Sequence, residues 1–138
     1  MSDTLNVIDR LVAATNAHDI EALVGCFDPT YVNETPAHPQ RGFGGRDQVR
    51  QNWTTIFAGV PDITAEVVSS AVVDDIAWTE WKMTGTRRDG EPHAMTGVII
   101  FGVRSDLIVS ARFYLEPVEQ TSGDVNAAID RAVKTSAP

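Results

Sequence analysis

The sequence has one cysteine, few basic residues and no long apolar run, and each shortage excludes something. Cys26 has no second cysteine to pair with, so the 138-residue chain forms no internal disulfide. Its 11 lysines and arginines stand against 19 acidic residues, and the net charge of −8 argues against nucleic acid and anionic membrane surfaces as partners. Because no stretch has the pattern of a transmembrane span or a signal peptide, we expect no membrane partner and a cytoplasmic location.

Motifs for metals and phosphates are missing as well. The His, Cys, Asp and Glu residues do not have metal-ligand spacing, so we expect no metal. The segment GFGGRD follows a loop rather than a strand, and is therefore neither a phosphate loop nor a dinucleotide fingerprint. We expect no cofactor. Cys26 lies in a helical pattern that favours a buried, inert thiol, with a reactive thiol as the alternative.

The apolar pattern predicts helices in the first half of the chain and strands in the second. The composition, 43% hydrophobic, supplies a core for one domain over residues 1–138, with a polar tail and a short helix over about 120–138. Helices are expected over about 4–16, 20–27 and 46–59, a short strand over 31–34, a loop over 35–45, and long strands over 63–73, 76–88, 92–104 and 107–116. This order gives an α+β fold, a curved and mostly antiparallel sheet with three N-terminal helices on its concave face. An amphipathic tail helix over 124–134 is a candidate to close the open end of this cone.

Five segments in this order resemble one known family. They are HDIEALVGCF, TYVNETP, GRDQVRQNWTTIF, WTEWKMTGTRRDG and SARFYLEPVE, and they cover about residues 5–119. Together they resemble the SnoaL-like branch of the nuclear transport factor 2-like superfamily. The resemblance implies the cone and a small-molecule pocket inside it. It implies no single activity, because the family holds cyclases, isomerases, hydrolases, dehydratases and non-catalytic binders.

The long hairpin predicts which side chains share a face. Asp89 and Gly90 are expected to form a two-residue turn, which places Glu80 opposite Ile99 and Lys82 opposite Gly97. The resemblance implies that the face carrying Glu80 and Lys82 points into the cone. The expected pocket wall then consists of Trp78, Met95, Ile99, Phe101, Phe113 and Leu115, with Tyr31 and Asn33 reaching in from the first strand.

Glu80 and Lys82 are the expected catalytic pair, because an ion pair at low dielectric can serve as a base or a proton donor. A structural ion pair is the alternative. Tyr31 and Asn33 match the Tyr-x-Asn of the limonene epoxide hydrolase family, whose catalytic arginine and aspartates are not retained. Further substrate-binding candidates are Glu34, His38 and His93, and for the two histidines an exposed position is the alternative.

These expectations lead to two functions. The first is a cofactor-independent isomerase, cyclase or hydrolase that acts on a small, largely apolar molecule by acid-base chemistry. The second is a non-catalytic binding or dimerisation module. A homodimer is expected because both sheet faces are partly apolar. Arg112, Tyr114 and Glu116 are expected on the convex face, unless a bulge in the last strand reverses the alternation.

Overall fold

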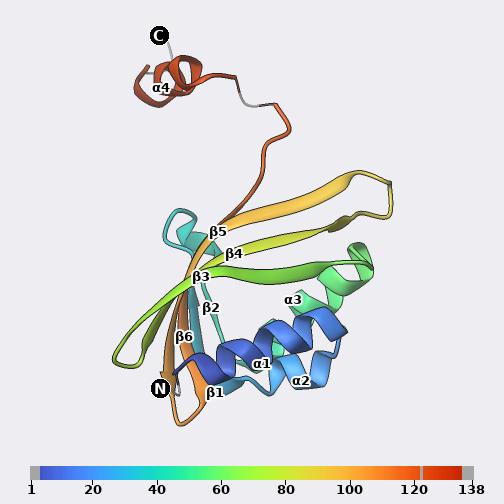
Figure 1. Cartoon of the computed structure of the whole chain (residues 1–138), viewed down its shortest axis with the longest axis vertical. Helices are drawn as coiled ribbons and strands as arrows, with labels where there is room; N and C mark the ends of the chain where they lie inside the picture. Colours follow the sequence, from blue (N-terminus) through green and yellow to red (C-terminus); the bar gives the residue numbers. More distant parts are fainter. Residues whose placement is uncertain (1–3, 122, 135–138) are drawn as a thin grey trace.

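The computed structural model describes residues 4–121 and 123–134, and they form a curved six-stranded sheet with helices on one side. The elements are α1 (Thr4–Ala17), α2 (Ile20–Val24), β1 (Phe27–Glu34), the 3-10 turn η1 (Pro39–Arg41), β2 (Phe43–Gly44), α3 (Arg46–Gly59), β3 (Thr64–Val73), β4 (Ile76–Thr86), β5 (Pro92–Arg104), β6 (Leu107–Pro117) and α4 (Val125–Val133). The strand order is β2-β1-β6-β5-β4-β3, and only β1 and β6 run parallel. Figure 1 shows α1, α2 and α3 inside the curve, which confirms the predicted α+β architecture.

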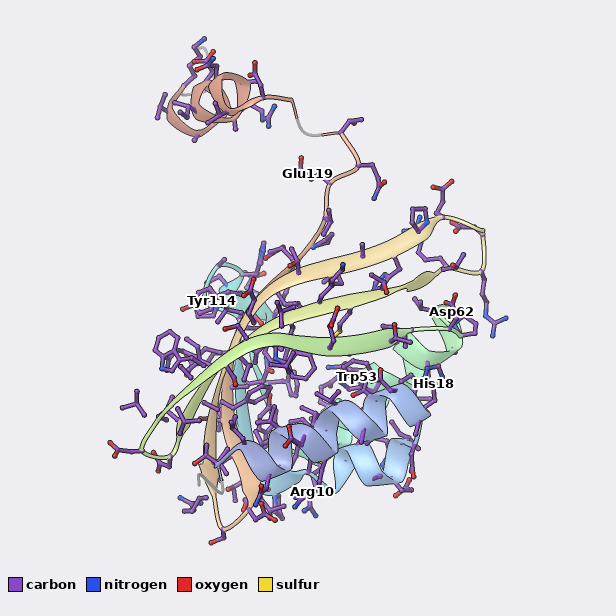
Figure 2. The ribbon with its side chains drawn as sticks, in the orientation of Figure 1. Arg10, His18, Trp53, Asp62, Tyr114 and Glu119 are labelled. Atoms are coloured by element: carbon purple, nitrogen blue, oxygen red, sulfur yellow. The ribbon has the colours of Figure 1, made fainter. Side chains whose placement is uncertain are left out.

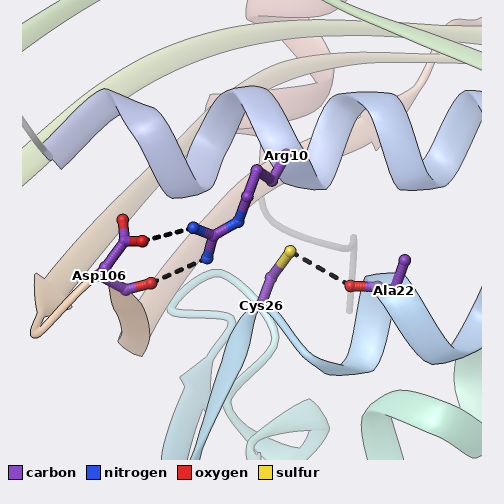
Figure 3. Close-up of polar contacts among 4 residues, drawn as sticks. All are labelled: Arg10, Ala22, Cys26 and Asp106. Atoms are coloured by element: carbon purple, nitrogen blue, oxygen red, sulfur yellow. Dashed lines mark hydrogen bonds and ion pairs between the residues drawn. The ribbon is translucent and has the colours of Figure 1, made fainter.

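Polar contacts from the middle and from the last turn of α1 hold it against the sheet. From the middle of the helix, the Arg10 guanidinium bonds the carboxylate of Asp106 and also donates to the Asp106 carbonyl oxygen at 2.9 Å (Figure 3). In the last turn, the Asn16 amide bonds both backbone groups of Ala65, at 2.9 and 2.7 Å. Because Asp106 lies in the β5–β6 turn and Ala65 in β3, these contacts span the concave face. The thiol of Cys26 is buried and donates to the Ala22 carbonyl oxygen, but the residue lies in the turn between α2 and β1 rather than in a helix. Its inertness stays a prediction.

The β4–β5 hairpin is one residue out of the predicted register. Arg87 N donates to Glu91 O, and Gly90 N donates to Arg87 O, each at 2.9 Å, so the loop contains Arg88, Asp89 and Gly90 rather than two residues. Gly90 takes the left-handed conformation (φ 86°) that such a loop requires. A shift of one residue turns every side chain of one strand to the other face of the sheet.

This shift corrects the expected faces of β4. Met83 stands opposite Met95, Thr79 opposite Ile99 and Trp81 opposite Gly97. Thr79, Trp81 and Met83 are therefore buried on the concave face, whereas Trp78, Glu80 and Lys82 are exposed on the convex face. The β5 and β6 side chains kept their predicted faces.

Trp81 forms the centre of the core. Its Nε1 donates to the Thr79 hydroxyl at 2.7 Å, and that hydroxyl donates to the Ile99 carbonyl oxygen at 2.6 Å. The Trp81 ring meets Phe101 edge-on at 6.2 Å. Gly97, opposite Trp81, has φ 145°, and a Cβ there would lie 2.1 Å from the Tyr114 carbonyl oxygen. A glycine is therefore required where β5 and β6 approach this closely.

Three smaller expectations also change. The second helix ends at Val24, and β1 already begins at Phe27 rather than Tyr31, with Pro29 inside an irregular stretch of the β1–β6 pairing. The expected loop over 35–45 contains η1 and the short strand β2. The tail does form a helix, α4, capped by the Asp124 side chain, but Figure 1 shows it apart from the sheet rather than over its open end. None of the helices among the described residues is long and apolar enough to cross a membrane.

Candidate functional site

A pocket of about 310 Å³ lies between α3, β1 and the concave face of β4, β5 and β6. Figure 2 shows Trp53, on α3, on the helix side of the sheet. Most of the wall is apolar, with polar groups contributed by a few side chains. The lining residues are Phe27, Tyr31, Asn33, Thr35, Arg41, Phe43, Val49, Asn52, Trp53, Ile56, Ile63, Met83, His93, Met95, Phe113 and Leu115.

Six of the predicted site residues lie in this wall: Tyr31, Asn33, His93, Met95, Phe113 and Leu115. They meet there because β1, β5 and β6 are neighbours in the sheet and alternate residues face the same side. Their role in binding stays a prediction. Ile99 and Phe101 lie deeper, buried in the core, where they border a separate cavity of about 30 Å³.

Glu80 and Lys82 do not reach the pocket, and the expectation that they point inward is wrong. Both are exposed on the convex face, as a consequence of the hairpin register. Among the described residues no ion pair joins their side chains. Trp78 shares that face and is 45% exposed, so it is no part of the pocket wall either.

Glu34 and His38 also lie outside the pocket wall. Glu34 is exposed at the end of β1, beside Arg112 of β6. The His38 Nε2 and the Glu116 Oε1 are 2.8 Å apart, and both side chains are partly exposed.

Arg112, Tyr114 and Glu116 alternate with the inward Phe113 and Leu115, and Figure 2 shows Tyr114 on the side away from the helices. Their predicted convex placement is confirmed, because the β6 irregularity lies before Ser110 and leaves the later alternation intact.

Tyr31 and Asn33 form the buried polar corner of the pocket. They stand two apart on β1 and share a face, so the Tyr31 hydroxyl can donate to the Asn33 Oδ1 at 2.7 Å. The Tyr31 ring packs edge-on against Phe27 at 4.7 Å and is 1% exposed. Burial raises the pKa of the Tyr31 phenol, which therefore stays neutral and acts as a hydrogen-bond donor.

Three polar groups of the wall were not predicted. Asn52 lies on α3 between Val49 and Ile56, and its Oδ1 accepts from the Gln48 Nε2 at 2.8 Å. A polar amide at an apolar-face position of a helix is a signal that the sequence did contain. Thr35 and Arg41 belong to the β1–β2 connection, where no periodic pattern points to a pocket.

The pocket contains no carboxylate: no Asp or Glu stands among its lining residues. Within residues 4–121 and 123–134, no group of three or more His, Cys, Asp or Glu side chains is placed to hold a metal ion. The ionisable groups of the wall are the Tyr31 phenol, the Arg41 guanidinium and the His93 imidazole. The pocket is thus equipped mainly to donate hydrogen bonds.

Removing one oxygen tests the buried polar corner. Tyr31→Phe leaves the Asn33 Oδ1 without its donor, so we expect the free energy of unfolding to fall by about 1–2 kcal/mol in urea denaturation. Because burial raises the pKa of Tyr31, the wild type keeps this contribution below the unfolded pKa of about 10 and loses it at higher pH. The variant should therefore lose less stability than the wild type above that pH. Thr54→Val removes a hydroxyl from an exposed side chain of α3 and is the control; equal effects of the two substitutions would contradict this assignment.

Comparison with known proteins agrees with this fold. IdmH from Streptomyces antibioticus, a candidate polyketide cyclase, is 24% identical, with a TM-score of 0.72, and the match covers 83% of this chain and 93% of IdmH. RV0760c from Mycobacterium tuberculosis, solved with estradiol-17beta-hemisuccinate, is 19% identical with a TM-score of 0.71, covering 83% and 94%. A protein of ketosteroid isomerase-like fold from Catenulispora acidiphila, solved with trimethylamine, is 17% identical with a TM-score of 0.68, covering 78% and 84%.

No curated protein is significantly similar to this chain in sequence. The sequence nevertheless points to the same fold, because the profile of the SnoaL-like domain matches residues 8–111. That match runs from α1 into β6 and includes the strands that carry Tyr31, Asn33, His93 and Met95. The chain therefore belongs to the SnoaL-like domain family, with the ketosteroid isomerase-like fold of its structural neighbours.

Proposed function

We propose that this protein binds a small, largely apolar molecule in the pocket between α3 and the sheet. The observation that carries the proposal is the pocket itself, a cavity of about 310 Å³ with a mainly apolar wall and a few polar groups. Such a composition is typical of small-molecule sites. Structural neighbours that hold small ligands, estradiol-17beta-hemisuccinate and trimethylamine, support it.

Filling the pocket tests this proposal. Met95→Trp adds a larger side chain to the wall, so we expect it to weaken binding of 2-naphthamide, an apolar probe, by about tenfold or more in calorimetry. Thr84→Trp places the same ring on the exposed face of β4 and is the matched control, expected to keep the wild-type affinity within about twofold. Equal affinities for all three proteins would place the probe elsewhere and count against the pocket.

A second candidate function is catalysis of the isomerase, cyclase or hydrolase type, by acid-base chemistry without a cofactor. With Glu80 and Lys82 outside, the side chain in the pocket of the type that enzymes most often use for proton transfer is His93. Its half-buried imidazole lines the same cavity as the Asn33 amide, which can bind an oxygen of the substrate. This combination of a proton-transfer group and a hydrogen-bond donor is what favours catalysis.

His93→Gln separates the two functions. A catalyst should lose turnover by about 100-fold or more, while its affinity for the substrate stays within a few-fold, because glutamine still forms hydrogen bonds but does not transfer protons. The measurement is turnover and calorimetric affinity side by side, on a compound whose conversion the wild type catalyses. A variant that converts this compound at the wild-type rate would remove His93 from the chemistry, whereas a pure binding protein shows no turnover before or after the change.

We also propose a homodimer that forms through the convex face of the sheet. There Tyr114 stands beside Val98, and Ile100 beside Trp78. Tyr114 and Trp78 are exposed, Val98 is half-buried and Ile100 is buried, so these apolar side chains on β4, β5 and β6 form one partly exposed patch. An apolar patch of this kind is typical of a protein interface.

The buried, unpaired thiol of Cys26 supports a cytoplasmic location, which we propose as well.

Sedimentation velocity tests the dimer. The wild type should sediment at twice the 15.0 kDa mass of the chain, and Tyr114→Glu should shift it to the mass of one chain, because a charge buried in the interface would be desolvated. Val133→Glu introduces the same charge on the exposed α4 and should leave the dimer intact. A wild-type protein with the mass of one chain at micromolar concentration would refute this interface.

A further inference from the structure

The charged side chains of the pocket wall are basic, whereas the chain as a whole is acidic. The sequence has 19 acidic and 11 basic residues. Yet no Asp or Glu side chain lines the pocket, whereas Arg41 and His93 do. Carboxylates are thus absent from this pocket wall, although the chain as a whole is acidic. This points to a ligand that would be repelled by carboxylates.

The two amides of the pocket are oriented by their neighbours. The Asn33 Oδ1 accepts the Tyr31 hydroxyl at 2.7 Å, and the Asn52 Oδ1 accepts the Gln48 Nε2 at 2.8 Å. Each amide oxygen is thus engaged, and each NH₂ group remains as a donor. Within the described residues, neither Nδ2 group donates to a protein acceptor. Both side chains therefore offer the cavity hydrogen-bond donors rather than acceptors.

Arg41 adds a positive charge to this side of the pocket. It ends the turn η1, where its backbone N donates to the His38 carbonyl oxygen at 2.9 Å. Two residues later, Phe43 pairs with Asn33 across β1 and β2, so the turn brings Arg41 to the same region of the wall. In the described part of the chain its guanidinium has no side-chain hydrogen bond or ion pair. A guanidinium carries only donors, and it matches a carboxylate in shape and charge.

We propose that the pocket is specific for an apolar molecule that carries a carboxylate, bound by the Asn33 amide and the Arg41 guanidinium. The apolar body of this ligand lies against Met95, Phe113 and Leu115. The inference rests on the proposed small-molecule function and specifies its ligand class. A cationic amine finds no carboxylate partner in this wall, and a neutral ligand leaves the charge of Arg41 unused.

Three probes of nearly the same size test the ligand class. They are 2-naphthoate, 2-naphthamide and 2-naphthylmethylamine, which share one ring system and differ in charge at pH 7. We expect 2-naphthoate to bind about five- to tenfold tighter than the amide, because a charge-assisted hydrogen bond is about twice as strong as a neutral one. The amine should bind most weakly. Isothermal titration calorimetry at low ionic strength gives the three dissociation constants.

A substitution then assigns the preference to Arg41. Arg41→Gln should weaken 2-naphthoate by about threefold and leave 2-naphthamide within about twofold, since a partly exposed charge contributes modestly. Arg104→Gln removes the same charge at the exposed far end of β5 and is the matched control, expected to change neither constant. A loss that is equal for both substitutions would reflect only the net charge and would overturn the role of Arg41.

The remaining outcomes separate the inference from the function on which it rests. If 2-naphthamide binds as tightly as 2-naphthoate, and Met95→Trp abolishes both, the ligand class is wrong and the small-molecule pocket stands. If 2-naphthylmethylamine binds most tightly, the anion proposal is equally wrong. If none of the probes binds the wild type, the proposed function and the inference both fail.

Discussion

The pairing of Met83 with Met95 is the constraint on which the interior depends, because it fixes which face of β4 meets the helices. The Thr79 hydroxyl, bonded to Trp81 and to the Ile99 carbonyl, satisfies the polar groups that this register buries. A slip of one residue would expose Trp81 and bury Glu80. Burying a tryptophan contributes about 4–6 kcal/mol at the usual value per unit of apolar area. Since an unpaired buried charge costs several kcal/mol more, the observed register is strongly specified.

Most of the fold could be predicted from the sequence, because helices and strands follow from local periodicity. The register of the hairpin could not, because a two-residue and a three-residue loop both accept glycine at position 90, where φ is 86°. The alternation of Thr79, Trp81 and Met83 with Glu80 and Lys82 did contain the correct faces. The family resemblance instead implies that Glu80 and Lys82 point inward, and for this chain that implication is wrong.

The candidate site, too, contains residues that could be predicted from the sequence and residues that could not. Tyr31 and Asn33 were predictable, because two residues that alternate on one strand share a face wherever that strand lies. Arg41 was not, since the turn η1 approaches the wall only through the pairing of β2 with β1. Asn52 is intermediate, because its place on the apolar side of α3 is local, whereas its orientation depends on Gln48. The alternation of faces along one strand is therefore a local property that the sequence reveals. A pocket, by contrast, is built from elements that are far apart in sequence.

The same hydrogen bonds also limit the chemistry that the pocket can perform. Because burial raises the pKa of Tyr31, its phenol donates a hydrogen bond and does not ionise near neutral pH. The amide oxygens of Asn33 and Asn52 already accept hydrogen bonds from neighbouring side chains, so only their NH₂ groups remain to bind a ligand, as donors. An oxyanion that forms on a substrate would thus be stabilised, but its formation requires a base, and His93 is the wall residue suited to that role. The arrangement favours holding negative charge over generating it, so binding is the function that the geometry supports most directly.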